Sequence, residues 1–517
     1  MGTRRGVGAL SAMLLLGAAP IAPVDLLIRG GAVYPGEAAP FTGDVAVRSD
    51  RIVAVGRRLS LPTRRTIEAR GMIVAPGFID PHTHIGDDLA SPDAAKRLIP
   101  MFLLQGVTTA FIGNDGNGEP EVAATLARAT AAPVGINYAT WVGFGAIRTR
   151  VMGMADRAPT TAETTAMRVL VAKGVCKGAL GLSAGLFYVP QSFATTGEVV
   201  ELAREAAIRG GRYDSHIRDE SSYSVGLAAA VEEVLTIGRE AKIPVHIAHI
   251  KALGIDVWGQ APAIIAKVRA ARAAGLNVTA DQYPWEASGT SLVAALVPRW
   301  AQDGGRAAML ARFDDPALAT RLAADIAENL RKRGGADKLL ITKGPEKGRT
   351  LAQVAGTGDA VVAAITTIRI GDPSVISFNQ RADDIAAFMR EPWVMTGSDA
   401  SPGHPRLYGS FARKWAQYVR ADKVLTPRQF VLQSATRTAR NFALKDRGEL
   451  RAGAFADIVV FDPARYAARA TYAAPTLPAA GVRTVIVNGR IAVEGGKLTD
   501  VAAGRALAHR PKSGSCP

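Results

Sequence analysis

Residues 75–84 read Ala-Pro-Gly-Phe-Ile-Asp-Pro-His-Thr-His, a short apolar strand that ends in two histidines. Successive side chains of a strand point to opposite faces, so His82 and His84 share a face and can bind one ion. Imidazole nitrogen is a common zinc ligand. The segment therefore predicts a metal site at the carboxyl end of a strand.

Downstream of this segment, apolar strand-like runs alternate with Ala-rich helical stretches. The runs are VTTAFIG (107–113), PVGINY (133–138), ALGLSAG (179–185), RYDSHI (212–217), PVHIAHI (244–250), NVTADQY (277–283) and WVMTGSD (393–399). This alternation predicts parallel βα units, and their number favours an α/β fold of the (β/α)8, TIM-like barrel type over an open sheet. Residues 296–351 do not follow this alternation of strands and helices, and we expect an insertion there.

Both ends of the mature chain follow another pattern. Residues 24–75 and 446–500 contain short apolar runs separated by Gly, Asp and Asn, which predict β-hairpins. We expect the two segments to pair into one small β-sandwich beside a barrel that spans residues 76–445.

The first 23 residues combine a basic start with the uncharged apolar run Val7–Ala19. This predicts a signal peptide and an exported protein, periplasmic or secreted, with a cytoplasmic protein as the alternative. The run is too short to span a bilayer, and no other segment is long and apolar enough to do so. Residues 501–517 form a tail, and its SGSCP end (513–517), which contains Cys516, is predicted to be disordered.

Composition excludes several classes of protein. Hydrophobic residues make up 48% of the chain, which excludes a largely disordered protein. The 62 Lys and Arg exceed the 46 Asp and Glu, but basic residues are scattered, so no nucleic-acid partner is predicted. With two cysteines, a metal site must be built mainly from histidine and carboxylate; Cys176 is interpreted as a small buried residue. The Gly-rich run 178–190 matches no nucleotide-binding loop and is interpreted as barrel packing.

Six of the seven histidines follow predicted strands: His82, His84, His216, His246, His249 and His404. His246 lies three residues before His249, so strand alternation places it on the opposite face and outside the metal site. His404 is expected to orient its neighbours, and His509 in the tail is expected to have no role. Asp399 also ends a predicted strand, where it can bind metal or act as a general base.

The segment GFIDPHTH (77–84) resembles the metal-binding signature of the amidohydrolase superfamily. More narrowly, the chain resembles the N-acyl-D-amino-acid deacylases (D-aminoacylases). The motifs that carry this resemblance run in family order from about residue 24 to residue 495: GVTTAFIGNDG, GALGLSAGLFYVP, DSHIRDE, HIAHIKALG, DQYPWEASGTSL and SDASPGHPRLYGSF. The resemblance implies a barrel coupled to a small β-sandwich.

The resemblance also implies a set of metal ligands, for one or two Zn²⁺ ions or other divalent metals: His82, His84, Asp115, His216, His249 and Asp399. Family members carry a cysteine in the turn where this chain has Gly113-Asn114-Asp115-Gly116. A carboxylate can also bridge two ions, so Asp115 is expected to remain a ligand; the alternative is an aspartate that only forms an Asx-turn.

The substrate class that the resemblance implies is a small molecule, an N-acyl-D-amino acid. Its free carboxylate needs cations and hydroxyls, for which the candidates are Lys251, Tyr283, Ser288, Ser291 and Arg406. Arg406 is the first choice because a guanidinium can bind a carboxylate through two parallel hydrogen bonds. In the reaction implied, metal-activated water attacks the amide carbonyl, with Asp399 as general base and then acid.

Two alternatives stay open. The first is a dipeptidase or a cyclic-amide hydrolase of the hydantoinase type, and such enzymes often use a carboxylated lysine as a bridging ligand. The only lysine near the fourth strand, Lys177, precedes that strand instead of ending it. A catalytically silent exported binding protein on the same scaffold is the second alternative, which the full set of ligand-type residues disfavours. The oligomeric state stays open.

Overall fold

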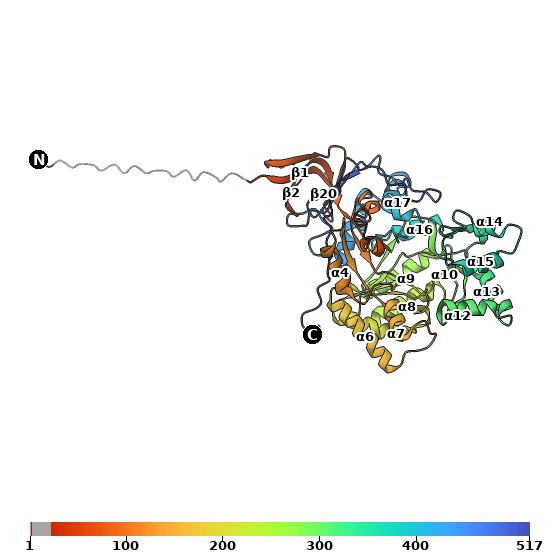
Figure 1. Ribbon diagram of the computed structural model, residues 1–517. Helices are drawn as coiled ribbons and strands as arrows, with labels where there is room; N and C mark the ends of the chain where they lie inside the picture. Colours follow the sequence, from red (N-terminus) through yellow and green to blue (C-terminus); the bar gives the residue numbers. More distant parts are fainter. Residues whose placement is uncertain (1, 3–21, 517) are drawn as a thin grey trace.

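The protein is shown in Figure 1 as a computed structural model that describes residue 2 and residues 22–516. The predicted signal segment therefore lies outside the described residues, apart from residues 2, 22 and 23. Among the helices of the described part, none is both long and apolar enough to cross a membrane.

Parallel strands form a closed barrel. In chain order they are β6 (Phe78–Asp80), β7 (Val107–Ile112), β8 (Asn137–Thr140) continued by β9 (Val142–Gly143), β10 (Gly181–Gly185), β11 (Arg212–His216), β12 (Val245–Ile247), β13 (Val278–Gln282) and β17 (Val394–Thr396). Each strand pairs in parallel with the next, and β13 pairs with β17. The barrel closes between β17 and β6, where the backbone N–H of His84 donates to the carbonyl of Ala400 at 3.0 Å. The predicted (β/α)8 barrel is confirmed.

Helices cover the outside of the barrel. They include α4 (Val122–Ala131), α5 (Phe144–Met152), α6 (Thr161–Cys176), α7 (Thr196–Ile208), α8 (Leu227–Glu240), α9 (Ala261–Ala273) and α16 (Ala382–Met389). Thr160 and Glu163 form a capping box at the start of α6, and Thr195 caps α7, which fixes where the Ala-rich stretches become helical. Their apolar faces pack with outward-facing strand residues such as Val245 and Ile247 in one large core. Short helices fill the remaining loops: α1 (Gly86–Leu89), α2 (Ala94–Arg97), α3 (Pro100–Leu103), α17 (Arg406–Arg413), α18 (Pro427–Val431) and α19 (Arg437–Asn441).

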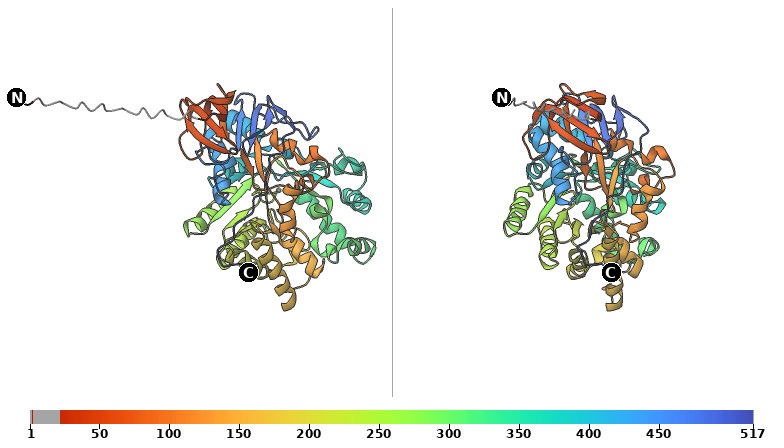
Figure 2. Two further views of the ribbon diagram at one scale, coloured as in Figure 1. Left: turned by 60° about the vertical axis from the view of Figure 1, so that its left-hand side comes forward. Right: turned by 90° about the vertical axis from the view of Figure 1, so that its left-hand side faces the viewer.

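The two ends of the chain share one nine-stranded sheet. Its strands are β1 (Val24–Val33), β2 (Phe41–Arg48), β3 (Arg51–Gly56), β4 (Thr63–Glu68), β5 (Ile73–Pro76), β18 (Ile458–Phe461), β19 (Val482–Val487), β20 (Arg490–Glu494) and β21 (Lys497–Leu498). The N-terminal and C-terminal segments meet where β5 pairs antiparallel with β18, with Ala75 opposite Val459. In Figure 2 these red and blue strands lie side by side at one end of the molecule. The predicted pairing of the chain ends is confirmed.

The insertion is larger than the expected 296–351. It comprises β14 (Ala287–Ser291), α10 (Leu292–Leu296), α11 (Arg299–Gln302), α12 (Gly305–Asp314), α13 (Ala319–Lys332), β15 (Leu339–Ile341), α14 (Leu351–Ala355), α15 (Ala360–Ile370) and β16 (Ser374–Phe378). The strands form a separate antiparallel sheet in the order β14-β16-β15. The Ala-rich helix α15 resembles a barrel helix in sequence, but its Ala364 and Ile368 pack into the insertion's own core. Helices α12–α15 project to one side of the barrel (Figure 1).

The tail is ordered through Cys516, contrary to the prediction, and Cys176 forms a disulfide with Cys516 rather than remaining a free buried thiol. The tail crosses the amino ends of β10 and β11, where the N–H of His509 donates to Gly178 at 2.9 Å and that of Lys512 to Arg209 at 3.1 Å. These bonds bring the two cysteines together although 340 residues separate them. His509, which was predicted to have no role, therefore helps to hold the tail against the barrel.

Candidate metal centre

Three of the predicted site residues have left-handed backbone conformations immediately after barrel strands. The φ angles are 58° at Asp115, 33° at His249 and 48° at Asp399. Non-glycine residues rarely adopt this region, and such conformations concentrate at functional sites. Each turns the chain sharply at a strand end, and together they direct three side chains toward the axis of the barrel.

The turn before Asp115 is held in place by its neighbours. Asn114 donates to Asp214 and to the carbonyl of Pro81, both at 3.1 Å, and Gln191 donates to the carbonyl of Asp115 at 2.9 Å. A side chain at Gly185 would lie 2.5 Å from that carbonyl, so the glycine of β10 permits the close approach of the turn. This agrees with the interpretation of the Gly-rich run as barrel packing.

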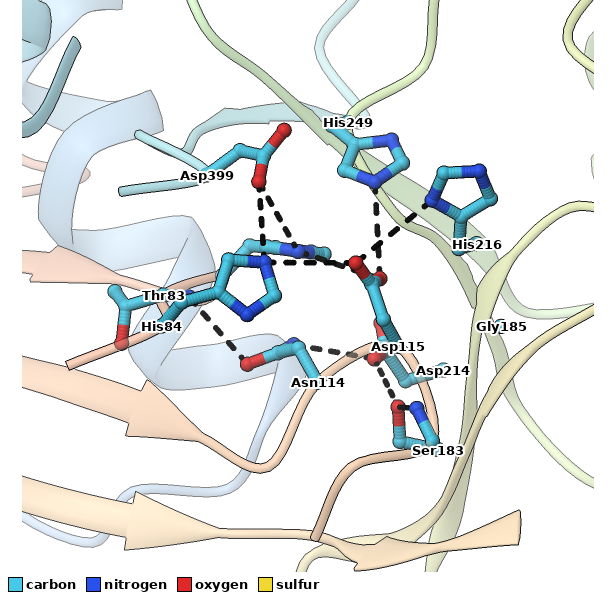
Figure 3. Close-up of polar contacts among 12 residues, drawn as sticks. Thr83, His84, Asn114, Asp115, Ser183, Gly185, Asp214, His216, His249 and Asp399 are labelled. Atoms are coloured by element: carbon cyan, nitrogen blue, oxygen red, sulfur yellow. Dashed lines mark hydrogen bonds and ion pairs between the residues drawn. The ribbon is translucent and has the colours of Figure 1, made fainter. Parts of the chain in front are cut away.

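Asp115 lies among His84, His216 and His249, which Figure 3 labels, and it also contacts His82. Its Oδ1 is 3.4 Å from Nε2 of His82 and 3.7 Å from Nε2 of His249. Its Oδ2 is 3.5 Å from Nε2 of His84 and 3.8 Å from Nδ1 of His216. No backbone N–H of the described chain donates to this carboxylate, which leaves the Asx-turn alternative without support. The four histidines thus surround this carboxylate, with His82 and His249 nearest to Oδ1 and His84 and His216 nearest to Oδ2.

Asp399 lies beside His82 and His84. Its Oδ1 is 3.2 Å from Nε2 of His84 and 3.8 Å from Nε2 of His82, and its Oδ2 is 2.6 Å from Nη1 of Arg406. Burial would raise the pKa of Asp399, but Arg406 and then His249 outweigh it and hold this pKa well below its usual range. Asp399 is therefore a carboxylate at neutral pH.

These residues fit a divalent metal. Three overlapping groups have ligand atoms within 4.8 Å of one another: His82, His84 and Asp115; His82, His249 and Asp399; and Asp115, His216 and His249. Both ring nitrogens of His82 and of His216, and Oδ1 of Asp115, are buried without a hydrogen-bond partner among the described residues. Buried polar atoms are normally satisfied, so unsatisfied ligand-type atoms that converge on one another indicate a metal-binding site.

Protonation in the metal-free protein follows from the same contacts. Burial would lower the pKa of His84, yet Asp115 and Asp399 raise it to about 9. Burial and Lys251 would lower the pKa of His249, yet Glu220 and the site aspartates raise it to about 10. Burial raises the pKa of Asp115, but the histidines, His82 foremost, bring it well below the usual value. The histidines and carboxylates of the cluster thus favour each other's charged forms.

Glu220 is a site residue that the sequence prediction missed. Its Oε1 lies 3.0 Å from Nδ1 of His249 and 2.5 Å from Nζ of Lys251, and its Oε2 lies 3.7 Å from Nε2 of His216. A carboxylate behind a ligating histidine fixes its ring orientation and tautomer. The motif DSHIRDE contains Glu220 four residues after His216, which was the available signal.

His246 is placed differently from the prediction. It faces the barrel interior, where its Nε2 lies 3.0 Å from Oδ2 of Asp281 and its Nδ1 lies 2.8 Å from Thr279. That same Oδ2 is 3.8 Å from Nδ1 of His82. Strand alternation fails as a guide because β12 ends at Ile247, and the left-handed turn at His249 redirects the later side chain. His246 nevertheless lies outside the three ligand groups.

The predicted substrate-binding residues line two different cavities. Lys251 and Ser288 line an inner cavity together with His216, His249 and Asp399, whereas Ser291 and Arg406 line an outer cavity. The ring of Tyr283 lies 4.8 Å from the guanidinium of Arg406 and 5.6 Å from Nζ of Lys251, and its hydroxyl accepts from Gln380 at 3.0 Å.

Ser291 is separate from this group. Its hydroxyl accepts from Ala294 at 3.1 Å as the cap of α10, and it faces an outer cavity. Ser288, whose hydroxyl donates to Asn379 at 3.1 Å, is thus the better placed of the two serines. His404 accepts from the backbone N–H of Arg406 at 3.0 Å, in agreement with an orienting role.

The outer cavity has a volume of about 1130 Å³ and opens onto the metal centre. His84, Asp115 and Asp399 form its inner end, and Ile376 of the insertion and Tyr472 beside the small sheet form part of its wall. The site thus has a wide outer space and a separate inner pocket that meet at Asp399.

A (β/α)8 barrel with buried histidines and aspartates gathered at the carboxyl ends of its strands has the arrangement of a metal-dependent enzyme, because active sites of such barrels lie at this end. Comparisons with known proteins agree, because the model of the amidohydrolase family matches residues 65–493. The chain belongs to this family.

Individual relatives are more specific. N-acyl-D-glutamate deacylase of Alcaligenes xylosoxydans xylosoxydans is 35% identical over 496 residues, covering 90% of this chain and 93% of the relative. The crystal structure of a D-aminoacylase matches with a TM-score of 0.81 at 32% identity, covering 94% of this chain and 100% of the other. N-acyl-D-glutamate deacylase from Bordetella bronchiseptica, solved with zinc and a phosphonate mimic of the tetrahedral intermediate, matches with a TM-score of 0.80 at 33% identity and the same coverage.

Proposed function

We propose that this protein is a metal-dependent hydrolase of N-acyl-D-amino acids that yields a carboxylate and a free D-amino acid. The observation that carries the proposal is the Asp115 carboxylate, which contacts four histidines beside an Asp399–Arg406 pair. Three similar proteins that match over nearly the whole chain are named N-acyl-D-glutamate deacylase, D-aminoacylase and N-acyl-D-aspartate deacylase.

In this proposal, His82, His84 and Asp399 hold one Zn²⁺ or other divalent ion, and His216 and His249 hold a second where two are bound, with Asp115 between them. When bound, such an ion polarises the amide carbonyl and lowers the pKa of a water molecule. Glu220 contributes by anchoring Nδ1 of His249, which leaves Nε2 facing Asp115.

Asp399 is the proposed general base and acid. It takes a proton from the water that attacks the carbonyl and delivers it to the nitrogen of the departing amino acid. Arg406 keeps Asp399 ionised before substrate arrives. A substrate carboxylate that binds Arg406 competes for the same cation, which leaves Asp399 a stronger base.

The carboxylate of the substrate is proposed to bind between Lys251 and Arg406. Both cations are buried and both face the ring of Tyr283; Lys251 and Ser288 line the inner cavity, and Arg406 lines the outer cavity. With the carboxylate and the scissile amide both fixed, the side chain has one direction left, which would select one enantiomer. The acyl group then lies in the outer cavity, which is open enough for groups larger than acetyl.

A release assay tests the proposal with N-acetyl-D-methionine, N-acetyl-D-glutamate, their L-enantiomers, D-containing dipeptides and hydantoins. We expect free D-amino acid from the N-acetyl-D compounds and little from their enantiomers. Preference for L-compounds, dipeptides or hydantoins would contradict it. Arg406→Ala is expected to raise KM by roughly 10-fold or more, as for a lost charged hydrogen bond.

We also propose that the protein is exported. The basic and apolar N-terminal residues have the composition of a signal peptide, and the Cys176–Cys516 disulfide is typical of oxidising compartments. Cell fractionation with mass spectrometry of the N-terminus tests this: we expect a shortened chain outside the cytoplasm. An uncleaved cytoplasmic chain with two free thiols would contradict the proposal.

A further inference from the structure

The interior of the barrel contains a buried histidine that the proposed reaction does not use. His246 on β12 is 1% exposed, and both of its ring nitrogens have polar partners. Its Nδ1 lies 2.8 Å from the hydroxyl oxygen of Thr279, and its Nε2 lies 3.0 Å from Oδ2 of Asp281. Thr279 and Asp281 both belong to β13, where residues two apart point to the same face. The three side chains therefore form one polar group inside the barrel.

The hydrogen bonds of this group have a defined direction, which starts at Arg212. A guanidinium can only donate, so Oδ1 of Asn441 accepts from Nη1 of Arg212 at 3.3 Å, and Nδ2 of Asn441 donates to Thr279 at 2.9 Å. No other acceptor for the hydroxyl of Thr279 is found within residues 22–516, so this hydroxyl donates to Nδ1 of His246. With Nδ1 as an acceptor, the ring of His246 carries its proton on Nε2 and donates it to Asp281.

Asp281 extends this chain of hydrogen bonds to the metal centre. Its side chain is fully buried, and the Oδ2 that accepts from His246 also lies 3.8 Å from Nδ1 of His82. Gly397 after β17 leaves the space for this carboxylate, because a side chain there would lie 2.3 Å from Oδ1 of Asp281. Nδ1 of His82 is buried and has no hydrogen-bond partner in the part of the chain that the structure describes.

The opposite nitrogen of His82 faces the metal ligands. Asp115 and Asp399 make their closest approach to His82 at Nε2, at 3.4 and 3.8 Å, whereas Asp281 makes its closest approach at Nδ1. A histidine that binds a metal through one nitrogen commonly donates its other N–H to a carboxylate, which fixes the tautomer and the orientation of the ring. Asp281 is placed to be that carboxylate for His82.

From this arrangement we infer that Asp281 and His246 are positioning residues for the metal centre. Asp281 accepts a hydrogen bond from Nδ1–H of His82 in the metal-bound protein, and His246 holds Asp281 in place. The inference rests on the metal centre of the proposed function. At 3.8 Å the contact is longer than a hydrogen bond, and a movement of about 1 Å brings the two atoms within bonding distance. A proton on Nδ1 leaves the lone pair of Nε2 free for the metal.

The two sides of the metal centre then have a similar construction. Glu220 contacts Nδ1 of His249 from the loop after β11, and Asp281 faces Nδ1 of His82 from inside the barrel. Neither Asp281 nor His246 lines the inner or the outer cavity. We therefore expect these two residues to act on the metal and not on the binding of substrate.

The affinity for Zn²⁺, measured by competition with a chelating dye, tests the inference without a measurement of activity. Asp281→Asn should weaken binding by roughly 10- to 100-fold, as is usual when the carboxylate behind a ligating histidine is lost. His246→Leu, which removes the donor to Asp281, should act in the same direction. Thr279→Val touches no ligand but removes the hydroxyl that sets the tautomer of His246, and it should weaken binding by roughly 3- to 10-fold, the value of one ordinary hydrogen bond.

Thr279→Ser keeps the hydroxyl and should restore the wild-type affinity. The visible absorption of the Co²⁺-loaded protein gives a second readout, since it reports the ligand geometry around the ion. We expect this spectrum to change in Asp281→Asn and in Thr279→Val and to be that of wild type in Thr279→Ser.

Two matched controls alter buried groups of the same kind outside the metal centre. Asp384→Asn changes a carboxylate, 4% exposed, that accepts from the backbone N–H of Gly259 at 2.8 Å. Thr367→Val changes a buried hydroxyl that donates to the carbonyl of Ala363 at 2.8 Å in helix α15. Both controls should keep the wild-type affinity and the wild-type Co²⁺ spectrum.

Unchanged affinity in Asp281→Asn or in Thr279→Val, equal losses in Thr279→Val and Thr279→Ser, or equal losses in the variants and their controls would overturn the inference. If Asp281→Asn does not fold, the two variants of Thr279 decide. These outcomes do not depend on hydrolysis, so a protein that binds metal as expected but does not cleave N-acyl-D-amino acids would refute the proposed function alone.

Discussion

Oδ2 of Asp399 lies 2.6 Å from Nη1 of Arg406, and both side chains are buried at the carboxyl end of the last barrel strand. The pair places an ionised carboxylate next to His82 and His84 and next to the cation that we assign to the substrate carboxylate. One residue thus connects the chemistry of the metal centre with the recognition of the substrate.

Asp399→Asn should lower kcat by roughly 10²- to 10⁴-fold, because the amide cannot carry the proton. Circular dichroism and Tm should show a folded protein. Asp457→Asn is the matched control, since Asp457 forms a buried ion pair with Arg447 just before β18, at the amino end of β6 and outside the ligand groups. It should lower Tm but keep kcat. Retention of kcat in Asp399→Asn would remove the base assignment.

Glu220→Gln should weaken metal binding by roughly 10- to 100-fold, as is usual when a carboxylate behind a ligating histidine is lost. The affinity is measured by competition with a chelating dye. Glu198→Gln serves as control, because Glu198 also forms a buried ion pair, with Arg148 at 3.0 Å, outside the metal centre. An unchanged affinity in Glu220→Gln, or an equal loss in both variants, would contradict the anchoring role of Glu220.

Metal uptake should release protons. The pKa values of His84 and His249 in the metal-free protein are raised to about 9 and about 10. Their charged forms therefore stabilise the metal-free fold fully below about pH 6.5, and this stabilisation is lost as the pH rises through 9 and 10. Near neutral pH, binding should release about two protons per chain. Calorimetry in buffers of different ionisation enthalpy measures the number, which should fall by about one in His84→Gln; release of none would contradict these assignments.

Replacing both Cys176 and Cys516 by serine should lower the free energy of unfolding by about 2–5 kcal/mol, since the bond closes a loop of 340 residues. The tail crosses the amino ends of the strands, opposite the metal centre, so kcat should not change. Denaturation and kinetics of the same preparations give both values. A large fall in kcat without loss of stability would mean that the tail acts on the site.

The sequence allowed most of the barrel to be predicted, because the repeated apolar strands and Ala-rich helices have periods that identify them locally. The ligand cluster could be predicted for a related reason: its members follow strand ends, and parallel strands of a barrel bring those ends together. The four histidines and Asp399 were found at such positions, whereas Asp115 and the assignment of the ligands came from the resemblance to the N-acyl-D-amino-acid deacylases.

What could not be predicted depends on contacts between distant segments or on the details of turns. Cys176 and Cys516 meet only because the tail crosses the barrel, and Glu220 meets Lys251 from a different loop. The rule of alternating faces failed at His246 because the strand ends before the left-handed turn at His249. The extent of the insertion depended on β14 pairing with β16, which lies far along the chain.

The central claim is that deacylation of N-acyl-D-amino acids depends on metal held by the cluster around Asp115. The most direct measurement is the rate of N-acetyl-D-amino acid hydrolysis by the full chain after removal of metal with a chelator, and again after addition of Zn²⁺, with metal content determined at each step. The account predicts one or two ions per chain, loss of activity on removal and its return on addition, and little bound metal in Asp115→Ala. A preparation free of metal that still hydrolyses N-acetyl-D-amino acids at the full rate would contradict it.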